Sequence, residues 1–401
     1  MMKRTLSRLD IKRGQRVLVR VDFNVPIEQG VETIASYDQR LRATLPTISY
    51  LLERDCRVVL CSHLGRPRGR VVESLRLAPV GDRLAALLER PVKNLGDCVG
   101  PQVESSVAAM APGHLALLEN LRFHPEEEAN EPEFAKGLAA LADCFVMDAF
   151  AVAHRAHAST VGLPPLLPSA MGLLMERELA ALSQALNVPE NGKPLAALLG
   201  GAKVGDKILV LERLLEKLDH LFIGGGMSVT FLRALGYGTG ASTIEEERLE
   251  FANSVLRRAK ERGSQVHLPL DVVVASRFAA DAPYVKTVAV NQVPAGWYIM
   301  DIGEATVRRF AQSLAECRTI IWNGPMGVFE MARFSHGTRA VAEAIAALPG
   351  VNSLVGGGST AEAVEELGLM DRMTHVSTGG GASLEFLEGK VLPGIAALPD
   401  A

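Results

Sequence analysis

Short apolar runs alternate with longer segments of helical hydrophobic spacing through both halves of the chain. Runs rich in valine, isoleucine and leucine are typical of parallel strands buried on both faces, and helices usually connect such strands. The predicted strands are Val17–Val21, Val58–Cys61, Leu115–Leu118 and Phe145–Met147 in the first half, and Leu195–Leu199, Leu221–Ile223, Thr319–Trp322, Ser353–Val355 and His375–Ser377 in the second. The pattern predicts an α/β protein with a parallel sheet flanked by helices in each half.

The length of the chain predicts two domains. Its 401 residues exceed the roughly 250–300 at which a single hydrophobic core usually divides. A helical pattern between Pro168 and Pro189 predicts a joining helix over 171–187. We therefore expect a first domain over 1–170 and a second over 188–382, with a tail, 383–401, that packs back on the first.

Polar clusters follow the strands of the first half. The segment Arg20-Val21-Asp22-Phe23-Asn24-Val25-Pro26 offers a guanidinium, a carboxylate and an amide where the strand ends, and Pro26 is expected to end it. Further clusters are Ser62–Arg70, Asn120–His124, His154–His157, and Arg40 with Arg42. A solvated charged surface could explain any one of them, but four at comparable strand ends favour an anion-binding site.

Glycine follows the strands of the second half instead. Gly-Gly-Gly triplets occur at 224–226, 356–358 and 379–381, together with Gly200-Gly201-Ala202-Lys203 and Asn323–Gly327. Glycine lets backbone N–H groups approach a phosphate closely, and helix N-termini add further donors. The two halves are therefore expected to bind different ligands.

Two known phosphate motifs can be compared with these loops. A P-loop is excluded at Gly200–Gly205, because Asp206 stands where its lysine is required. Gly356–Ala361 matches the dinucleotide pattern GxGxxA after a strand, so a NAD-dependent dehydrogenase is an alternative function. The next strand weakens it, because glycines follow that strand where an acidic residue should bind the ribose.

Composition excludes several other classes of protein. A net charge of −4 and a pI of about 6.2 argue against general binding to nucleic acid or to an anionic membrane. The five cysteines form no CxxC pair, which favours reduced, buried thiols in a cytoplasmic protein over zinc or disulfide sites. We expect neither a secretory signal nor a membrane-spanning helix, and no metal held by the histidines.

The polar residues include no nucleophile with an adjacent base in a known catalytic motif. What they offer is positioning and neutralisation of charge. Phosphoryl transfer requires chiefly these two contributions.

Seven ordered motifs give the chain a close resemblance to the phosphoglycerate kinase family over essentially its whole length. They are RVDFNVP at 20–26, SHLGRP at 62–67, ENLRFH at 119–124, AHRAH at 153–157, GGAKVGDK at 200–207, WNGPMGVFE at 322–330 and STGGGASLEFLEG at 377–389. The resemblance implies two Rossmann-like domains joined by a hinge helix. It also implies a cytoplasmic, hinge-bending monomer of glycolysis that exchanges a phosphoryl group between 1,3-bisphosphoglycerate and ADP, giving 3-phosphoglycerate and ATP.

The resemblance also implies roles for individual residues. The implied substrate-binding residues are Asp22, Phe23, Asn24, Arg40, His63, Leu64, Gly65, Arg66, Arg122 and Arg155. The implied nucleotide-binding residues are Lys207, Gly225, Gly303, Asn323, Pro325, Val328, Glu330, Gly357, Gly358, Ser359 and Thr360. Catalysis is expected from Arg40 and Lys203, with Gly358 and Gly381 at helix N-termini beside the transferred group.

One departure from the family concerns magnesium. The family usually has aspartate after its Gly-Gly-Gly triplet, where it helps to hold the Mg²⁺ of the nucleotide, whereas this chain has Ser359. A hydroxyl is a weaker ligand for this cation than a carboxylate. We expect Mg²⁺ to be used with ATP or ADP, held by phosphates and water, with Ser359 at most assisting through a water. A binding protein with weakened catalysis is therefore a second alternative.

Overall fold

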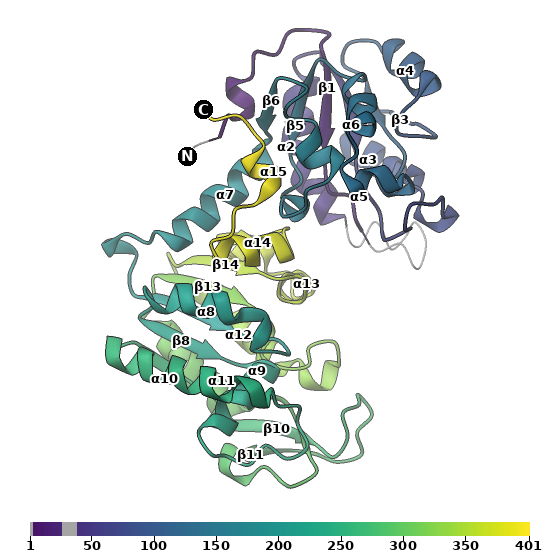
Figure 1. Cartoon of the computed structure of the whole chain (residues 1–401). Helices are drawn as coiled ribbons and strands as arrows, with labels where there is room; N and C mark the ends of the chain where they lie inside the picture. Colours follow the sequence, from purple (N-terminus) through teal and green to yellow (C-terminus); the bar gives the residue numbers. More distant parts are fainter. Residues whose placement is uncertain (1–2, 26–37) are drawn as a thin grey trace. The chain divides into compact units, whose positions relative to one another are not determined.

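The computed structural model describes residues 3–25 and 38–401, and the chain divides into two compact units (Figure 1). Unit 1 comprises Met1–Ala180 with Val391–Ala401, and unit 2 comprises Ala181–Lys390. Pro26, which was expected to end the first strand, lies outside the described residues. The segment expected to return to the first domain is divided: residues 391–401 belong to unit 1, whereas 383–390 belong to unit 2.

Unit 1 is built on one six-stranded parallel sheet. Its strands are β1 (Arg16–Arg20), β2 (Arg57–Cys61), β3 (Val92–Asn94), β4 (Leu115–Leu117), β5 (Cys144–Met147) and β6 (Ser169–Met171), in the order β3-β4-β2-β1-β5-β6. The last residue of β1, Arg20, pairs with Cys61 of β2 and Met147 of β5. This register brings the loops after β1, β2 and β5 together at one edge of the sheet.

Helices cover this sheet and bury its apolar side chains. They are α2 (Gln39–Leu52), α3 (Ala78–Leu88), α4 (Pro101–Ala108), α5 (Pro125–Ala129), α6 (Pro132–Ala139), α15 (Pro393–Ala396) and the first part of α7 (Leu173–Leu186). In the core, Val17 and Val58 of the sheet belong to the same buried cluster as Leu41 and Ile48 of α2. Burial of such side chains contributes roughly 1.5–3 kcal/mol each.

Unit 2 contains a second six-stranded parallel sheet. Its strands are β7 (Leu195–Leu199), β8 (His220–Ile223), β9 (Gln265–His267), β13 (Thr319–Asn323), β14 (Asn352–Gly356) and β15 (His375–Val376), in the order β15-β14-β13-β7-β8-β9. The chain order reverses between β7 and β13. A crevice at the carboxyl ends of the strands is expected at such a switch point.

Seven helices belong wholly to unit 2. They are α8 (Ile208–Leu215), α9 (Gly225–Ala234), α10 (Leu249–Arg262), α11 (Glu304–Leu314), α12 (His336–Ala347), α13 (Gly358–Glu366) and α14 (Gly380–Leu387). Trp322 and Phe222 of the sheet join Phe310 and Val341 of the helices in one buried cluster. The Trp322 indole N–H also donates to the carbonyl oxygen of Gly324 at 2.9 Å. The core of unit 2 thereby fixes the loop that follows β13.

The α/β prediction is confirmed, and each of the nine predicted strands is present with ends shifted by at most one residue. The short edge strands β3, β6 and β9 were not predicted. Also unpredicted is an antiparallel sheet, ordered β11-β10-β12, of β10 (Asp271–Ala275), β11 (Val285–Ala289) and β12 (Tyr298–Ile302). In β11 the apolar residues are interrupted by Lys286 and Thr287 and the strand is half-buried or exposed, so a search for apolar runs does not detect it. The short run Val272–Ala275 of β10 was overlooked.

Two expectations from composition can be compared with the described residues. All five cysteines are free and buried, which confirms the prediction of reduced, buried thiols. Over the same residues, the structure contains no helix with the length and apolar character needed to cross a membrane.

A buried histidine pair in unit 2 predicts a pH-dependent stability. His267, 3% exposed, lies 3.1 Å from His220 between Nε2 and Nδ1. Burial, reinforced by His220, lowers the pKa of His267 to about 4. The unfolded chain binds a proton below pH ~6.5 that the folded chain does not. The free energy of unfolding of unit 2 should therefore fall as the pH drops from ~6.5 towards 4.

Urea unfolding followed by tryptophan fluorescence tests this, because both tryptophans, Trp297 and Trp322, lie in unit 2. Between pH ~6.5 and 4, the unfolding free energy of the wild-type protein should fall more steeply with decreasing pH than that of His267→Phe. The two slopes should differ by at most ~1.4 kcal/mol per pH unit. The unfolding free energies of the two proteins at pH 8, where His267 is neutral, serve as the reference. Equal slopes in the two proteins would contradict the assignment.

Candidate active site

A basic cluster lies at the carboxyl edge of the unit 1 sheet. We use this name for the side chains of Arg20, Arg40, His63, Arg122, Arg155 and His157, which come from β1, α2 and the loops after β2, β4 and β5. The four arginines are close enough to His63 for their charges to act on it. The structure therefore brings together the first-half residues that the sequence had placed at separate strand ends.

Asp22 and Arg40 form an ion pair at this edge. Asp22 is largely buried, whereas the Arg40 side chain is 36% exposed and so remains accessible to a ligand. Nearby, the Asn24 Oδ1 accepts from the backbone N–H of Gly65 at 2.8 Å. The Gly65 carbonyl in turn accepts from Arg122 Nη1 at 2.9 Å. These contacts fix the loops after β1, β2 and β4 against one another.

Both histidines of the cluster are neutral at pH 7. Burial, reinforced by Arg20 and then by the other arginines, lowers the pKa of His63 well below its ordinary value. Burial, reinforced by Arg20, Arg122, Arg155 and His154, lowers the pKa of His157 to about 4. The positive charge of the cluster therefore comes from the arginines and does not change between pH 6 and 8.

The sequence analysis included Arg20 in the polar cluster that ends the first strand, but not among the individual substrate-binding or catalytic residues. The Arg20 side chain is 1% exposed and donates to Ser159 Oγ at 2.8 Å, while Nη2 lies 3.2 Å from His63 Nδ1. The signal was its position as the last residue of an apolar strand, where an unpaired guanidinium would be very costly to bury.

Three of the expected substrate-binding residues, Phe23, Leu64 and Arg66, are not part of the basic cluster. The side chains of Phe23 and Leu64 are buried in the core of unit 1, so these residues offer backbone groups at most. Arg66 is exposed. Arg155 is half-buried and close enough to affect the pKa of both His63 and His157.

Unit 2 contains two adjoining pockets. The smaller, of about 230 Å³, is lined by Gly201, Ala202, Lys203, Asp206, Lys207, Asn323, Gly324, Pro325, Gly357, Gly358, Ser359 and Thr360. Glycine backbone, two lysines and the first residues of α13 thus surround one space. Such a combination suits a phosphate group.

Lys207 and Lys203 occupy this pocket in different ways. Lys207 is 9% exposed, its Nζ donates to Asn323 Oδ1, and burial lowers its pKa. Lys203 is exposed and lines both pockets. Lys207 is therefore held in place by the protein, whereas Lys203 is free to move with a ligand.

The loops after β7, β8 and β13 approach one another through backbone atoms. Gly201 N donates to the Pro325 carbonyl and Gly225 N to that of Met326, each at 2.9 Å. Gly324 has φ +103°, and a Cβ there would overlap the Gly200 carbonyl. The sequence requires glycine at this contact because a side chain would separate the loops.

The larger pocket, of about 680 Å³, shares Lys203, Pro325 and Ser359 with the smaller one. It includes Gly225, Val328 and Glu330 from the sequence prediction. Its other walls include Val272 of β10, Tyr298 of β12 and Phe278, which the sequence analysis missed because the antiparallel sheet was not predicted. An apolar, aromatic pocket beside a phosphate-binding one suits a nucleotide.

Two expected residues line neither pocket. Gly303 precedes α11, and a Cβ on it would overlap the Asp271 carboxylate, so its glycine is required by packing. Gly381 is the second residue of α14. The preceding residue, Gly380, is closer to the small pocket, since a Cβ there would lie 3.6 Å from the backbone nitrogen of Gly358.

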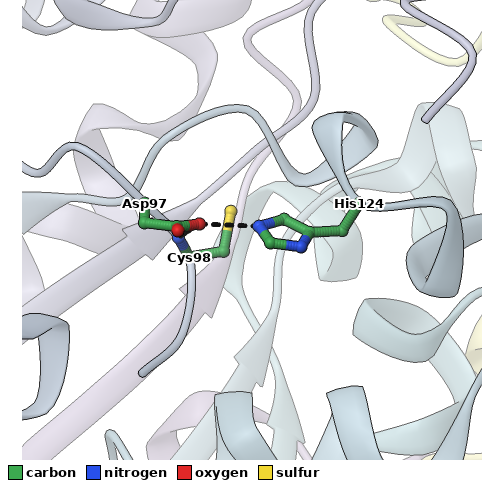
Figure 2. Close-up of side chains that lie close together, drawn as sticks. All are labelled: Asp97, Cys98 and His124. Atoms are coloured by element: carbon green, nitrogen blue, oxygen red, sulfur yellow. Dashed lines mark hydrogen bonds and ion pairs between the residues drawn. The ribbon is translucent and has the colours of Figure 1, made fainter. Parts of the chain in front are cut away.

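Among the residues that the structure describes, one group of possible metal ligands is found, and it lies in unit 1. Asp97, Cys98 and His124 bring their ligand atoms within 4.8 Å of one another (Figure 2). Asp97 Oδ1 lies 2.6 Å from His124 Nε2, and the Cys98 thiol donates to the Glu119 carbonyl at 3.0 Å. These contacts account for the three side chains without a cation.

Comparisons with known proteins agree with this geometry. A sequence model of the family described as phosphoglycerate kinase matches residues 6–390. The phosphoglycerate kinase of Moorella thermoacetica is 54% identical over 400 residues, and that of Synechococcus elongatus 54% over 406, with 100% of each chain covered in both cases. The chain belongs to the phosphoglycerate kinase family.

Solved structures of this family have the same fold. The phosphoglycerate kinase from Coxiella burnetii matches with a TM-score of 0.83 at 42% identity, covering 98% of both chains. The phosphoglycerate kinase from Pyrococcus horikoshii matches with a TM-score of 0.83 at 33% identity, covering 99% of this chain and 98% of that one.

Membership of the phosphoglycerate kinase family defines the reaction. The chain is a phosphotransferase of glycolysis with a carboxyl group as acceptor, exchanging a phosphoryl group between 1,3-bisphosphoglycerate and ADP to give 3-phosphoglycerate and ATP. The relatives named above favour neither a dehydrogenase nor a binding protein without activity.

The close approach at Gly324 generates a prediction. Gly324→Ala should weaken ADP binding at least ~10-fold. The positive φ and the overlapping Cβ together impose strain of more than ~1.4 kcal/mol, which the loops can relieve only by moving apart. Isothermal titration calorimetry measures the affinity. Gly238→Ala, in the same unit and with open space around its Cβ, should bind ADP as the parent does. Wild-type affinity in a folded Gly324→Ala variant would refute this.

Proposed function

We propose that the basic cluster of unit 1 binds 3-phosphoglycerate and 1,3-bisphosphoglycerate. Arginine forks match the geometry of phosphate and carboxylate oxygens, and neutral histidines add N–H donors. Arg40, His63, Arg66, Arg122 and Arg155 would bind the phosphate groups, while Asp22, Asn24 and the backbone of Phe23, Leu64 and Gly65 would fix the glycerate end. The convergence of four arginines on His63 supports this assignment.

The nucleotide would bind in unit 2, and the pair of adjoining pockets is the observation that carries this proposal. The apolar pocket would take the adenine ring, beside Gly225, Pro325 and Val328. Glu330, an exposed carboxylate on its wall, would accept from the ribose hydroxyls. The phosphates would lie against Lys207, Asn323 and the residues Gly357–Thr360 that open α13.

The reaction would need no general base. The carboxylate of 3-phosphoglycerate is ionised near neutral pH, since such groups have pKa values of about 3.5. The transferred group instead requires in-line placement and positive charge. Arg40 and Lys203 would supply this charge, with the helix N-termini at Gly358 and Gly381. Because these residues belong to different units, we propose that the units close together during turnover and exclude water.

Magnesium would accompany the nucleotide. Mg²⁺ prefers oxygen ligands and commonly binds through one or two carboxylates plus phosphates and water. The smaller pocket fits this requirement, because it offers the Asp206 carboxylate and the Ser359 hydroxyl beside the proposed phosphate position. Bound there, the cation would neutralise phosphate charge. Asp206, which sequence reasoning did not propose, would be its carboxylate ligand, with Ser359 assisting through a water.

We also propose that the protein acts as a cytoplasmic monomer without nucleic-acid or membrane partners. The reduced, buried cysteines support a reducing compartment. The net charge of −4 opposes binding to polyanions. The hinge-bending behaviour and monomeric state rest on the resemblance to the family.

The catalytic assignment predicts that Arg40→Ala and Lys203→Ala each lower kcat by at least ~100-fold while leaving the fold intact, as expected for groups that stabilise developing charge. Turnover of 3-phosphoglycerate with Mg-ATP, coupled to reduction of the 1,3-bisphosphoglycerate formed, measures this. Arg42→Ala is the matched control, because Arg42 lies in the same helix but pairs with Asp38. Near-wild-type turnover of either active-site variant would exclude its assigned role.

The metal assignment predicts that Ser359→Asp lowers the Mg²⁺ concentration for half-maximal turnover several-fold, about the effect of exchanging a hydroxyl for a carboxylate ligand. The measurement is a magnesium titration of turnover at fixed ATP. Ser359→Ala serves as control and should shift the midpoint little, because a water can replace the hydroxyl. An unchanged midpoint in Ser359→Asp would show that position 359 does not govern the metal.

A further inference from the structure

Glu127 lies beneath the basic cluster and has no part in the functions proposed above. It belongs to α5 and its side chain is completely buried. Both of its carboxylate oxygens are used by one residue: Oε2 accepts from the backbone N–H of Ser159 at 3.0 Å, and Oε1 accepts from the Ser159 hydroxyl at 2.5 Å. A buried carboxylate is costly, so two such bonds indicate a specific positioning of Ser159.

Ser159 passes this constraint on to Arg20. Its Oγ donates its proton to Glu127 and accepts from Arg20 Nε at 2.8 Å. A second guanidinium nitrogen of Arg20 donates to the carbonyl of Val21. The third, Nη2, lies 3.2 Å from Nδ1 of His63. The guanidinium is thus held at all three nitrogens, and its orientation is fixed.

The contact between Arg20 and His63 determines where the imidazole proton lies. A guanidinium only donates hydrogen bonds, so Nδ1 of His63 must accept and therefore carries no proton. The remaining proton is on Nε2, at another edge of the ring. Burial and the arginine charges also hold the pKa of His63 well below its ordinary value, which agrees with a neutral ring.

We propose that Glu127 is a positioning residue for substrate binding, because through Ser159 and Arg20 it locks His63 in the neutral form that presents an Nε2 N–H to the anionic substrate. This deepens the proposed function, on which it rests. The same contacts hold the turn after β5, since Ser159 lies two residues from His157, whose Nδ1 is 3.7 Å from Glu127 Oε1.

Glu127→Gln tests the proposal with a side chain of the same shape. Glutamine has one acceptor oxygen. When this oxygen accepts from the Ser159 N–H, the amide nitrogen donates to Ser159 Oγ, and the hydroxyl proton loses the carboxylate that fixes its direction. The KM for 3-phosphoglycerate should rise about 10-fold, in line with the loss of a charge-assisted hydrogen bond. The KM for ATP should stay close to wild type, while the thermal midpoint should fall, because a buried charge-assisted hydrogen bond is lost. Glu126→Gln, an exposed neighbour in α5, is the matched control.

Long-range proton–nitrogen NMR spectra of the histidine side chains provide a readout that is independent of activity. The signals of His63 are assigned as those missing from the spectrum of His63→Gln. In the wild-type full-length chain the ring should show a protonated Nε2 and an unprotonated Nδ1, and it should not titrate between about pH 6 and 8. In Glu127→Gln the ring should exchange between tautomers. Ser159→Ala, which interrupts the chain of contacts at the hydroxyl, should do the same and keeps the test valid if Glu127→Gln does not fold.

Three outcomes would overturn the proposal: an unchanged KM for 3-phosphoglycerate in the folded variants, an equal rise in the KM for ATP, or an unchanged His63 tautomer. Failure of the proposed function is distinguishable from these results. If 3-phosphoglycerate leaves the His63 signals of the wild-type protein unperturbed, the substrate assignment fails. The tautomer comparison between variants would then still report on the contact network alone.

Discussion

Arg20 lies at the last ladder position of β1, where it pairs with Cys61 on one side and with Met147 on the other. This in-register parallel pairing determines which parts of the chain can meet. His63 and Ser159, which are 43 and 139 residues from Arg20 in the sequence, reach the same edge of the sheet only because parallel strands all end there. A slip of one residue would turn every side chain of β1 to the opposite face and move Arg20 away from Ser159 and His63.

Concentrating four arginines at one edge creates an electrostatic problem that the fold solves in two ways. Carboxylates lie beside the arginines: Asp22 pairs with Arg40, and Glu128 with Arg122 at 3.1 Å. The two histidines remain neutral, so that they add hydrogen-bond donors without adding charge. The cluster therefore attracts anions strongly without the mutual repulsion that six cations would impose.

Much of the parallel core, and the strand ends at which both candidate sites lie, could be predicted from the sequence. Strands such as Leu195–Leu199 are continuous apolar runs, and polar or glycine residues directly after them identify the functional edge. What escaped prediction depends on tertiary contacts. Phe278 precedes the half-exposed strand β11, and Tyr298 begins β12. Because neither strand was predicted, these side chains could not be placed on a pocket wall. Glu127 is one of three consecutive glutamates in the sequence. Only the tertiary structure shows that it is buried, whereas its two neighbours are exposed.

The two adjoining pockets of unit 2 are made of different material. The smaller pocket is lined mainly by glycine-rich loops, and where these loops meet, at Gly225 and Gly324, a Cβ would overlap backbone atoms. The larger pocket is lined by side chains such as those of Val272 and Phe278. Main-chain groups are the same whatever the sequence, whereas side chains change with each substitution. With the nucleotide bound as proposed, substitutions can alter preference for the base one residue at a time, while recognition of the phosphate chain is inherited with the backbone.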